Sequence, residues 1–176
     1  MAKLLNASAY RNIERPYTRK SKYRKKSFVR AVPHNKIVRF VMGDRTSEFE
    51  YVVKLKSKSP LQIRHEAIES ARKTCNRELM EKAPENYRFK IRMYPHHVLR
   101  NNPLAAGAGA DRMSTGMSHS FGKPIGIAAQ VREGQTMFQV KVDKDRVDVA
   151  KRALHKARQK LPCGCRVTVE RVDDQE

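Results

Sequence analysis

Two short clusters hold the side chains of this sequence that are best suited to chemistry. His96 and His97 are adjacent and could ligate a metal ion. Cys163 and Cys165 flank a single glycine and could complete such a site. Structural zinc sites usually place two to four residues between paired cysteines, however, and sequence alone does not bring the two clusters together. We therefore favour polar histidines at the end of a strand and two cysteines in a turn, with no metal. A metal-dependent or nucleic-acid-modifying enzyme is the alternative.

Other motifs of catalytic or cofactor-binding sites are incomplete or absent in this sequence. Gly107 and Gly109 could begin a dinucleotide-binding fingerprint, but the third glycine is missing at its required offset and no parallel β-α-β unit follows. The chain offers no paired carboxylates, nucleophile elbow or Walker loop. We expect a binding protein with no catalytic residues and no cofactor.

Positive charge is the strongest property of the chain. Its 38 Lys and Arg outnumber 18 Asp and Glu, which gives a net charge of +20. Such a charge opposes compaction unless a polyanion neutralises it, and nucleic acid is the default because phosphate binding releases counterions. Residues 1–30 hold ten of the cations and one acid, interleaved with aromatic rings that could stack on bases. We expect residues 1–33 to be an extended basic arm that binds RNA.

Two other interpretations of the arm are a solubilising tail and a nuclear-localisation signal. Neither explains why the rest of the chain also carries a net charge of +11. The sequence has no apolar run of about 18 residues that could span a bilayer, and its first residues are unlike a secretory signal. Three cysteines without a secretory context argue against a disulfide framework. We expect a soluble, intracellular protein that does not bind membranes.

Alternating apolar residues predict several strands in the remainder of the chain. They are expected over residues 36–41, 49–55, 87–93, 125–131, 138–142 and 166–172. The strand over 87–93 should present a cationic row opposite its apolar face. Gly134 marks a turn that predicts a hairpin between the fourth and fifth strands, and Val167 and Val169 should face inward in the last one.

Two helices are predicted between these strands. Ser59 as N-cap and Pro60 as first helical residue would begin a helix that continues to Leu79, with Cys75 on its buried stripe as a small hydrophobe. Apolar residues at spacings of three and four predict a second helix over 147–161, with a basic outer face. Two helices that each cover a sheet face imply an α+β fold, a two-layer sandwich of mixed or antiparallel strands.

Residues 94–124 do not fit this scaffold, because small residues dominate a segment that is too apolar for an ordinary linker. Its glycines permit close approach by another backbone, and Asp111 could cap a short helix from Arg112 onward. Long connections of this kind are often functional. We expect one domain over 34–172 that contains a Gly/Ala-rich loop at 101–112, followed by an acidic tail at 173–176.

The run from Tyr94 to Pro124, YPHHVLRNN…AGADRMSTGM…FGKP, resembles the L10e family of archaeal and eukaryotic large-subunit ribosomal proteins, the counterpart of bacterial L16. RPYTR at 15–19, the helix at 63–72 and the final basic helix with its strand fit the same family. The resemblance implies a small protein of helices and strands that binds large-subunit rRNA near the peptidyl transferase centre, borders A-site tRNA and joins late in assembly. Peptide-bond chemistry then belongs to the rRNA, and the protein is structural.

Two positions depart from the family pattern. Ser118 follows Gly116 and Met117, where relatives commonly have a basic residue, so no phosphate contact is expected there. The chain ends at Glu176 without the longer extension of eukaryotic relatives. Together these features favour an archaeal-type protein of the cytoplasm.

The predicted site has two parts. Residues expected to bind rRNA are cations of the arm, the strand row, the loop exit and the last helix: Arg11, Arg15, Arg19, Lys20, Lys22, Arg24, Lys25, Lys26, Arg30, Arg88, Lys90, Arg92, Lys123, Arg152 and Lys156. The resemblance implies a tRNA-proximal loop with its flanks: Arg100, Asn101, Asn102, Gly107, Gly109, Asp111 and Arg112. Expected partners are large-subunit rRNA, the acceptor end of A-site tRNA, other large-subunit proteins and late assembly factors; no homo-oligomer is expected.

Overall fold

The computed structural model describes residues 4–84, 86–104, 114, 116–119 and 122–172. The helices within these ranges are α1 (His65–Lys82) and α2 (Val147–Arg158), with single 3-10 turns η1 (Ala7–Tyr10), η2 (Arg24–Lys26) and η3 (Lys144–Arg146). The strands are β1 (Val41–Gly43), β2 (Tyr51–Ser57), β3 (Leu61–Arg64), β4 (Arg88–Ile91), β5 (His97–Asn101), β6 (Lys123–Val131), β7 (Thr136–Val142) and β8 (Cys165–Arg171). The predicted α+β class is confirmed.

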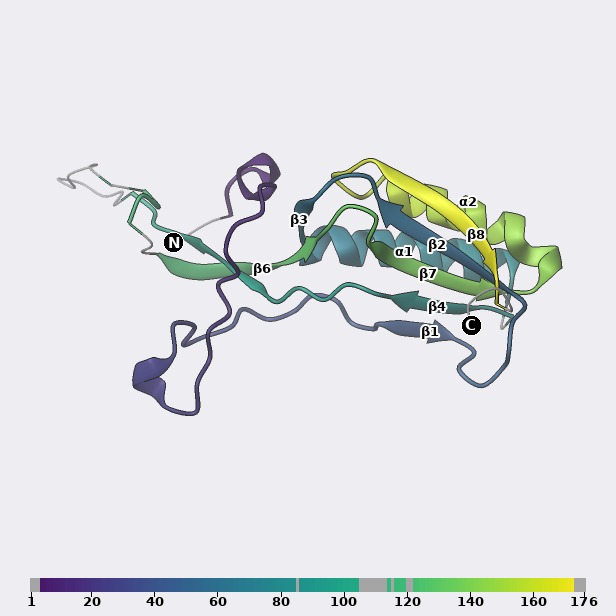
Figure 1. The fold of residues 1–176 in the computed structure, drawn as a ribbon, viewed down its shortest axis with the longest axis horizontal. Coiled ribbons are helices and arrows are strands. Elements are labelled where there is room, and N and C mark those ends of the chain that lie inside the picture. The colour runs from purple at the N-terminus through teal and green to yellow at the C-terminus, as the bar shows by residue number, and fades with distance from the viewer. Residues whose placement is uncertain (1–3, 85, 105–113, 115, 120–121, 173–176) are drawn as a thin grey trace.

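The strands form two antiparallel sheets. The larger has the order β1-β4-β7-β2-β8, and the smaller has the order β3-β6-β5. Figure 1 shows α1 and α2 on the same side of the larger sheet, with β6 of the smaller sheet extending away from it. Neither α-helix of the described chain has the length and apolar character that a membrane span requires.

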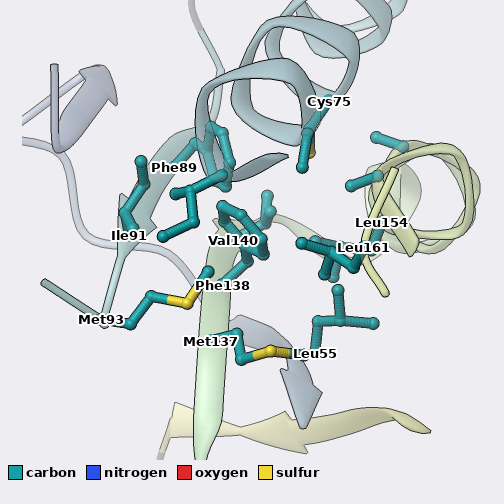
Figure 2. Close-up of a cluster of buried hydrophobic side chains, with 14 of the residues drawn as sticks. Leu55, Cys75, Phe89, Ile91, Met93, Met137, Phe138, Val140, Leu154 and Leu161 are labelled. Carbon is teal, nitrogen blue, oxygen red and sulfur yellow. The ribbon is translucent and has the colours of Figure 1, made fainter. Parts of the chain in front are cut away.

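The main core lies between the two helices and the larger sheet. Phe89 of β4 and Phe138 of β7 are fully buried with ring centroids 5.7 Å apart. Figure 2 shows Cys75 of α1 and Leu154 of α2 directed into the same cluster. Cys75 is fully buried, which confirms its predicted place on the buried stripe, and burial raises the pKa of its thiol. The helix predicted over 147–161 is confirmed as α2, with Ala150, Leu154 and Ala157 buried as expected, but it ends at Arg158, so Leu161 packs on the core from the turn that follows.

The predicted start of the first helix is wrong. Residues Leu61–Arg64 form β3, and α1 begins at His65. Leu61 and Ile63 are buried and pair with Val131 and Ala129 of β6. This non-local pairing outweighs the local Ser-Pro signal, because an amphipathic strand buries the same apolar side chains.

The predicted hairpin is also wrong. Consecutive strands β6 and β7 belong to different sheets, since β6 pairs with β3 and β5 while β7 pairs with β2 and β4. The turn itself exists, with Gly134 at φ +71. Ser57 at the end of β2 donates its N–H to the Gln135 carbonyl and accepts from Gly134, so the turn is held against β2.

Of the strand predicted over 36–41, only its last residue lies in β1. The N–H groups of Lys36 and Val38 instead donate to His65 Nδ1 and Glu69 Oε2 at the start of α1. Side chains of the helix thus satisfy the backbone donors that a neighbouring strand would otherwise take. In β8, which is an edge strand, Val167 packs against the core but Val169 is 39% exposed.

Candidate nucleic-acid interface

The face of the larger sheet opposite the helices is cationic. In β4, Phe89 and Ile91 are buried in the core while Arg88 and Lys90 alternate with them, which confirms the predicted row. Arg92 continues the row beyond the strand and lines a hollow of about 220 Å³ with Arg88, Lys90, Gln139 and Lys141. Alternation places every second side chain of a strand on the same face.

Neighbouring strands widen this row into a surface that we call the sheet-face patch. Register pairs Arg88 with Lys141 and Lys90 with Gln139, and further along the sheet pairs Lys56 with Arg166. The patch comprises Lys54, Lys56, Arg88, Lys90, Arg92, Lys141 and Arg166. The members from β2, β7 and β8 were not predicted. Period-two alternation indicates a polar face on each strand, but it does not give the strand order that brings these faces together.

Acidic side chains lie beside both ends of the patch: Glu170 is on β8, and Glu48 and Glu50 line a hollow with Arg88 and Lys141. Glu170 of β8 accepts from Lys54 at 2.5 Å and from Lys56 at 3.2 Å. Within the described ranges, no ion pair is recorded for the cations contributed by β4, its extension and β7. Like charges opposite one another on a sheet repel, as for Arg88 and Lys141. An anion bound at Arg88 and Lys141 would relieve that repulsion.

The basic arm is docked on the smaller sheet. Gln62 of β3 is buried, and its amide donates to the carbonyls of Tyr10 at 3.1 Å and Asn12 at 2.6 Å. Its backbone N–H donates to the Arg11 carbonyl. At the other side of the sheet, Val98 of β5 donates to the carbonyl of Tyr17. Figure 1 shows the purple arm crossing this sheet.

His97 has a structural role in this docking. Its Nδ1 accepts the Tyr17 N–H at 2.8 Å, and its side chain is buried. Burial lowers the pKa of His97, which keeps the ring neutral and able to accept. His96 is exposed and packs beside Tyr94. No group of three or more metal-ligating side chains is found in the part of the chain that the structure describes.

The most basic run of the arm closes into a loop instead of remaining simply extended. The N–H groups of Phe28 and Val29 both donate to the Arg19 carbonyl, and Val29 is buried with Val98 and Ile127. Tyr23 is 64% exposed and Phe28 58% exposed. All nine arm cations predicted to bind rRNA are exposed: Arg11, Arg15, Arg19, Lys20, Lys22, Arg24, Lys25, Lys26 and Arg30. Charges and rings are thus presented outward together.

The remaining predicted cations lie elsewhere. Lys123 is exposed at the start of β6, and Arg152 is exposed on α2. Lys156 forms an ion pair with Glu78 of α1, which is only 3% exposed and also binds Lys82. Lys156 and Lys82 hold the pKa of Glu78 below its usual range. The predicted residues therefore do not form one surface, because α2 lies on the opposite side of the larger sheet from the patch.

The flanks of the Gly/Ala-rich loop are ordered by the arm and by the β5-β6 ladder. The Arg100 guanidinium lies 3.7 Å from the ring centroid of Tyr17. Asn101 pairs with Lys123, and the Asn102 amide donates to the Gly116 carbonyl. The other predicted loop residues, Gly107, Gly109, Asp111 and Arg112, lie outside the described residues, as do the acidic tail and the predicted helix start.

Gly122 is a further residue of this region, and it is not among the predicted site residues. A Cβ at this position would meet Met117 Sδ at 2.9 Å and the carbonyl carbon of Asn101 at 3.0 Å. A side chain at this position would require Met117 to move and the Asn101 backbone to shift by a few tenths of an ångström. The feature of the sequence that could have indicated this constraint is the place of the glycine between the Gly/Ala-rich segment and the strand β6.

Comparison with known proteins places these surfaces in context. A family model described as Ribosomal protein L16p/L10e matches residues 18–168. The chain is 45% identical over 164 residues to the large ribosomal subunit protein uL16 of Methanococcus maripaludis, covering 93% of this chain and 92% of that protein. It is 45% identical over 148 residues to the uL16 of Picrophilus torridus, covering 84% of each chain. It is 43% identical over 155 residues to the uL16 of Hyperthermus butylicus, covering 88% of this chain and 83% of that protein.

Proposed function

Because this chain belongs to the L16p/L10e family of ribosomal proteins, we propose that it binds large-subunit rRNA near the peptidyl transferase centre and helps to position A-site tRNA. As a member of that family it is a structural constituent of the large ribosomal subunit in the cytoplasm, and it is not an enzyme. Its partners are rRNA and other proteins of that subunit.

The observation that carries the rRNA proposal is the sheet-face patch. Arg88, Lys90 and Arg92 recur at every second residue, roughly 6.5 Å apart at the rise of a strand. Lys141 lies across from Arg88 and completes a group of cations whose charge no described acid neutralises by an ion pair. A row of phosphates is the complementary partner for such a row of cations.

The arm supplies the second rRNA-binding surface. Its docked segment, held by Gln62 and His97, fixes where the chain leaves the smaller sheet. Beyond that point the loop closed by Arg19 presents cations and exposed rings, which suit a site between RNA segments because rings stack on unpaired bases. An arm that enters between RNA segments also fits late entry into the subunit and contact with assembly factors.

The tRNA part of the proposal rests on the base of the Gly/Ala-rich loop. Arg100 lies over Tyr17, so the arm and the loop flank are coupled by direct contact. Segment 101–112 leaves from the end of β5, beside Lys123. The absence of side chains at Gly107 and Gly109 would admit a tRNA acceptor end that bulkier residues exclude. Arg112 and Asp111 would then flank the approach.

The rRNA proposal is tested by removing two lysines from the patch. The double variant Lys90→Ala/Lys141→Ala should bind large-subunit rRNA about tenfold more weakly at moderate salt. The slope of log affinity against log salt is negative, and its magnitude should decrease by about 1.5 for the two lost phosphate contacts. The assay is filter binding of the purified full chain across a salt series.

A matched control removes the same charge elsewhere. Lys144 and Lys160 are exposed and lie outside the patch, so Lys144→Ala/Lys160→Ala should leave the salt slope unchanged. Equal losses of affinity and slope in the two double variants would show that net charge alone, and not the patch, determines binding.

A further inference from the structure

Cys163 and Cys165 form a close pair of thiols that neither rRNA surface uses. Their Sγ atoms lie 3.6 Å apart, and both residues are free cysteines. Cys165 begins β8 and is only 2% exposed, whereas Cys163 is partly open to solvent. Cys163 is therefore the cysteine of the pair that a reagent can reach first, and Cys165 lies beneath the surface.

The backbone around the pair holds the two sulfurs together. Cys165 pairs in register with Ser57 of β2, and Lys58 donates its N–H to the Gly164 carbonyl at 3.0 Å. A disulfide requires sulfurs about 2.05 Å apart, so they must approach by roughly 1.5 Å. Gly164 carries no Cβ between them, which leaves the backbone freedom to make that adjustment.

The electrostatics distinguish the two thiols. Cys165 Sγ donates to the Cys163 carbonyl oxygen at 3.4 Å. A hydrogen bond between the two sulfurs lowers the pKa of Cys163 to about 7 against the opposing effect of burial, with help from the Ser57 hydroxyl. The same hydrogen bond and burial raise the pKa of Cys165, although Arg158 of α2 and Lys58 oppose the rise. Near neutral pH Cys163 is thus the more readily ionised sulfur of the pair.

We propose that Cys163 and Cys165 are a redox-reactive dithiol that closes to an intramolecular disulfide by exchange with a small-molecule disulfide of the glutathione class. The Cys163 thiolate attacks one sulfur of that molecule, forms a mixed disulfide and releases one thiolate. Cys165 then loses its proton and attacks the Cys163 sulfur, which releases the second thiolate. The protein loses two electrons and two protons, and the small disulfide becomes two thiols.

The rest of the chain supports the assignment of roles. Cys75, the third cysteine, is fully buried and burial raises its pKa, so it takes no part. A low-pKa thiolate beside a second cysteine that can resolve the mixed disulfide is the arrangement expected of a redox-reactive site. The next residue, Arg166, belongs to the sheet-face patch, whereas alternation along β8 directs Cys165 to the opposite face, into the core.

The test treats the purified full chain with oxidised glutathione near neutral pH and follows its intact mass. Wild-type protein should lose two hydrogen atoms and retain one thiol that can be alkylated after denaturation. Peptide mapping should place the disulfide between positions 163 and 165. Before oxidation, Cys163 should be alkylated roughly tenfold faster than an ordinary exposed thiol at the same pH.

Single variants separate the steps. Cys165→Ser should stop at one bound glutathione on Cys163, Cys163→Ser should not react, and Cys75→Ser should close as wild type does. Accumulation of the mixed disulfide in the wild-type chain, disulfides between chains, or no change of mass would each overturn the proposal. Circular dichroism of each variant checks that a missing reaction does not reflect a missing fold.

Discussion

Replacing Gln62 should release the basic arm while leaving the main core folded. The Gln62 amide donates two hydrogen bonds to arm carbonyls, those of Tyr10 and Asn12. Its buried position means that Gln62→Ala leaves both carbonyls without this donor. At about 1 kcal/mol for each net hydrogen bond, docking weakens by about 2 kcal/mol, which raises the undocked population about 30-fold.

Limited proteolysis with trypsin measures this population directly. The bond after Arg11 is protected by docking, since the Arg11 carbonyl accepts from the Gln62 N–H. When opening is fast relative to cleavage, the rate follows the open population, so cleavage there should be about 30-fold faster in Gln62→Ala. Gln159→Ala, which changes an exposed glutamine after α2, is the control and should cleave as wild type does.

Hydrogen exchange at core amides completes the measurement. Amides of β7, such as Val140, should exchange at the same rate in wild type and Gln62→Ala. An unchanged cleavage rate after Arg11 would refute the docking role of Gln62. Parallel acceleration at Arg11 and in β7 would show that the arm does not release as a separate unit.

Further predictions concern pH, the loop base and α2. Because burial lowers the pKa of His97, the folded chain resists its protonation, so docking should be strongest above about pH 6.5 and weaken below it. The measurement is the protection factor of the Tyr17 amide, corrected for the intrinsic exchange rate at each pH; a constant protection factor down to about pH 5 would contradict this. Gly122→Ala should destabilise the protein by about 1–3 kcal/mol in urea unfolding, because its Cβ would lie 3.0 Å from the backbone at the end of β5; an unchanged midpoint would contradict that contact. Lys156→Ala should lower the melting temperature by removing a partner of buried Glu78 and leave rRNA affinity within about twofold; the reverse pattern would restore Lys156 to the RNA surface.

Features set by local periodicity could be predicted from the sequence. Apolar residues spaced by three and four predicted α2, and its buried residues match them. Period-two alternation predicted the cationic row at Arg88 and Lys90. The side chains of a strand alternate between its two faces whatever strands lie beside it, so this pattern can be read from one segment alone.

Features set by non-local pairing could not be predicted in the same way. Leu61 and Ile63 have positions compatible with both helix and strand, and only pairing with β6 decides between them. Lys54 and Lys141 join the patch because β7 lies between β4 and β2, an order that no local pattern encodes. The roles of Gln62 and His97 in holding the arm could not be predicted for the same reason, because the arm residues that they bind are far away in the chain.

A cryo-EM map of the large subunit from the source organism, with tRNA in the A site, tests the central claim most directly. The proposal predicts rRNA phosphates against Arg88, Lys90, Arg92 and Lys141, RNA on both sides of the arm loop, and segment 101–112 directed at the tRNA acceptor end. A map in which the sheet face is turned to solvent or covered by protein, with the loop directed away from the tRNA, would contradict it.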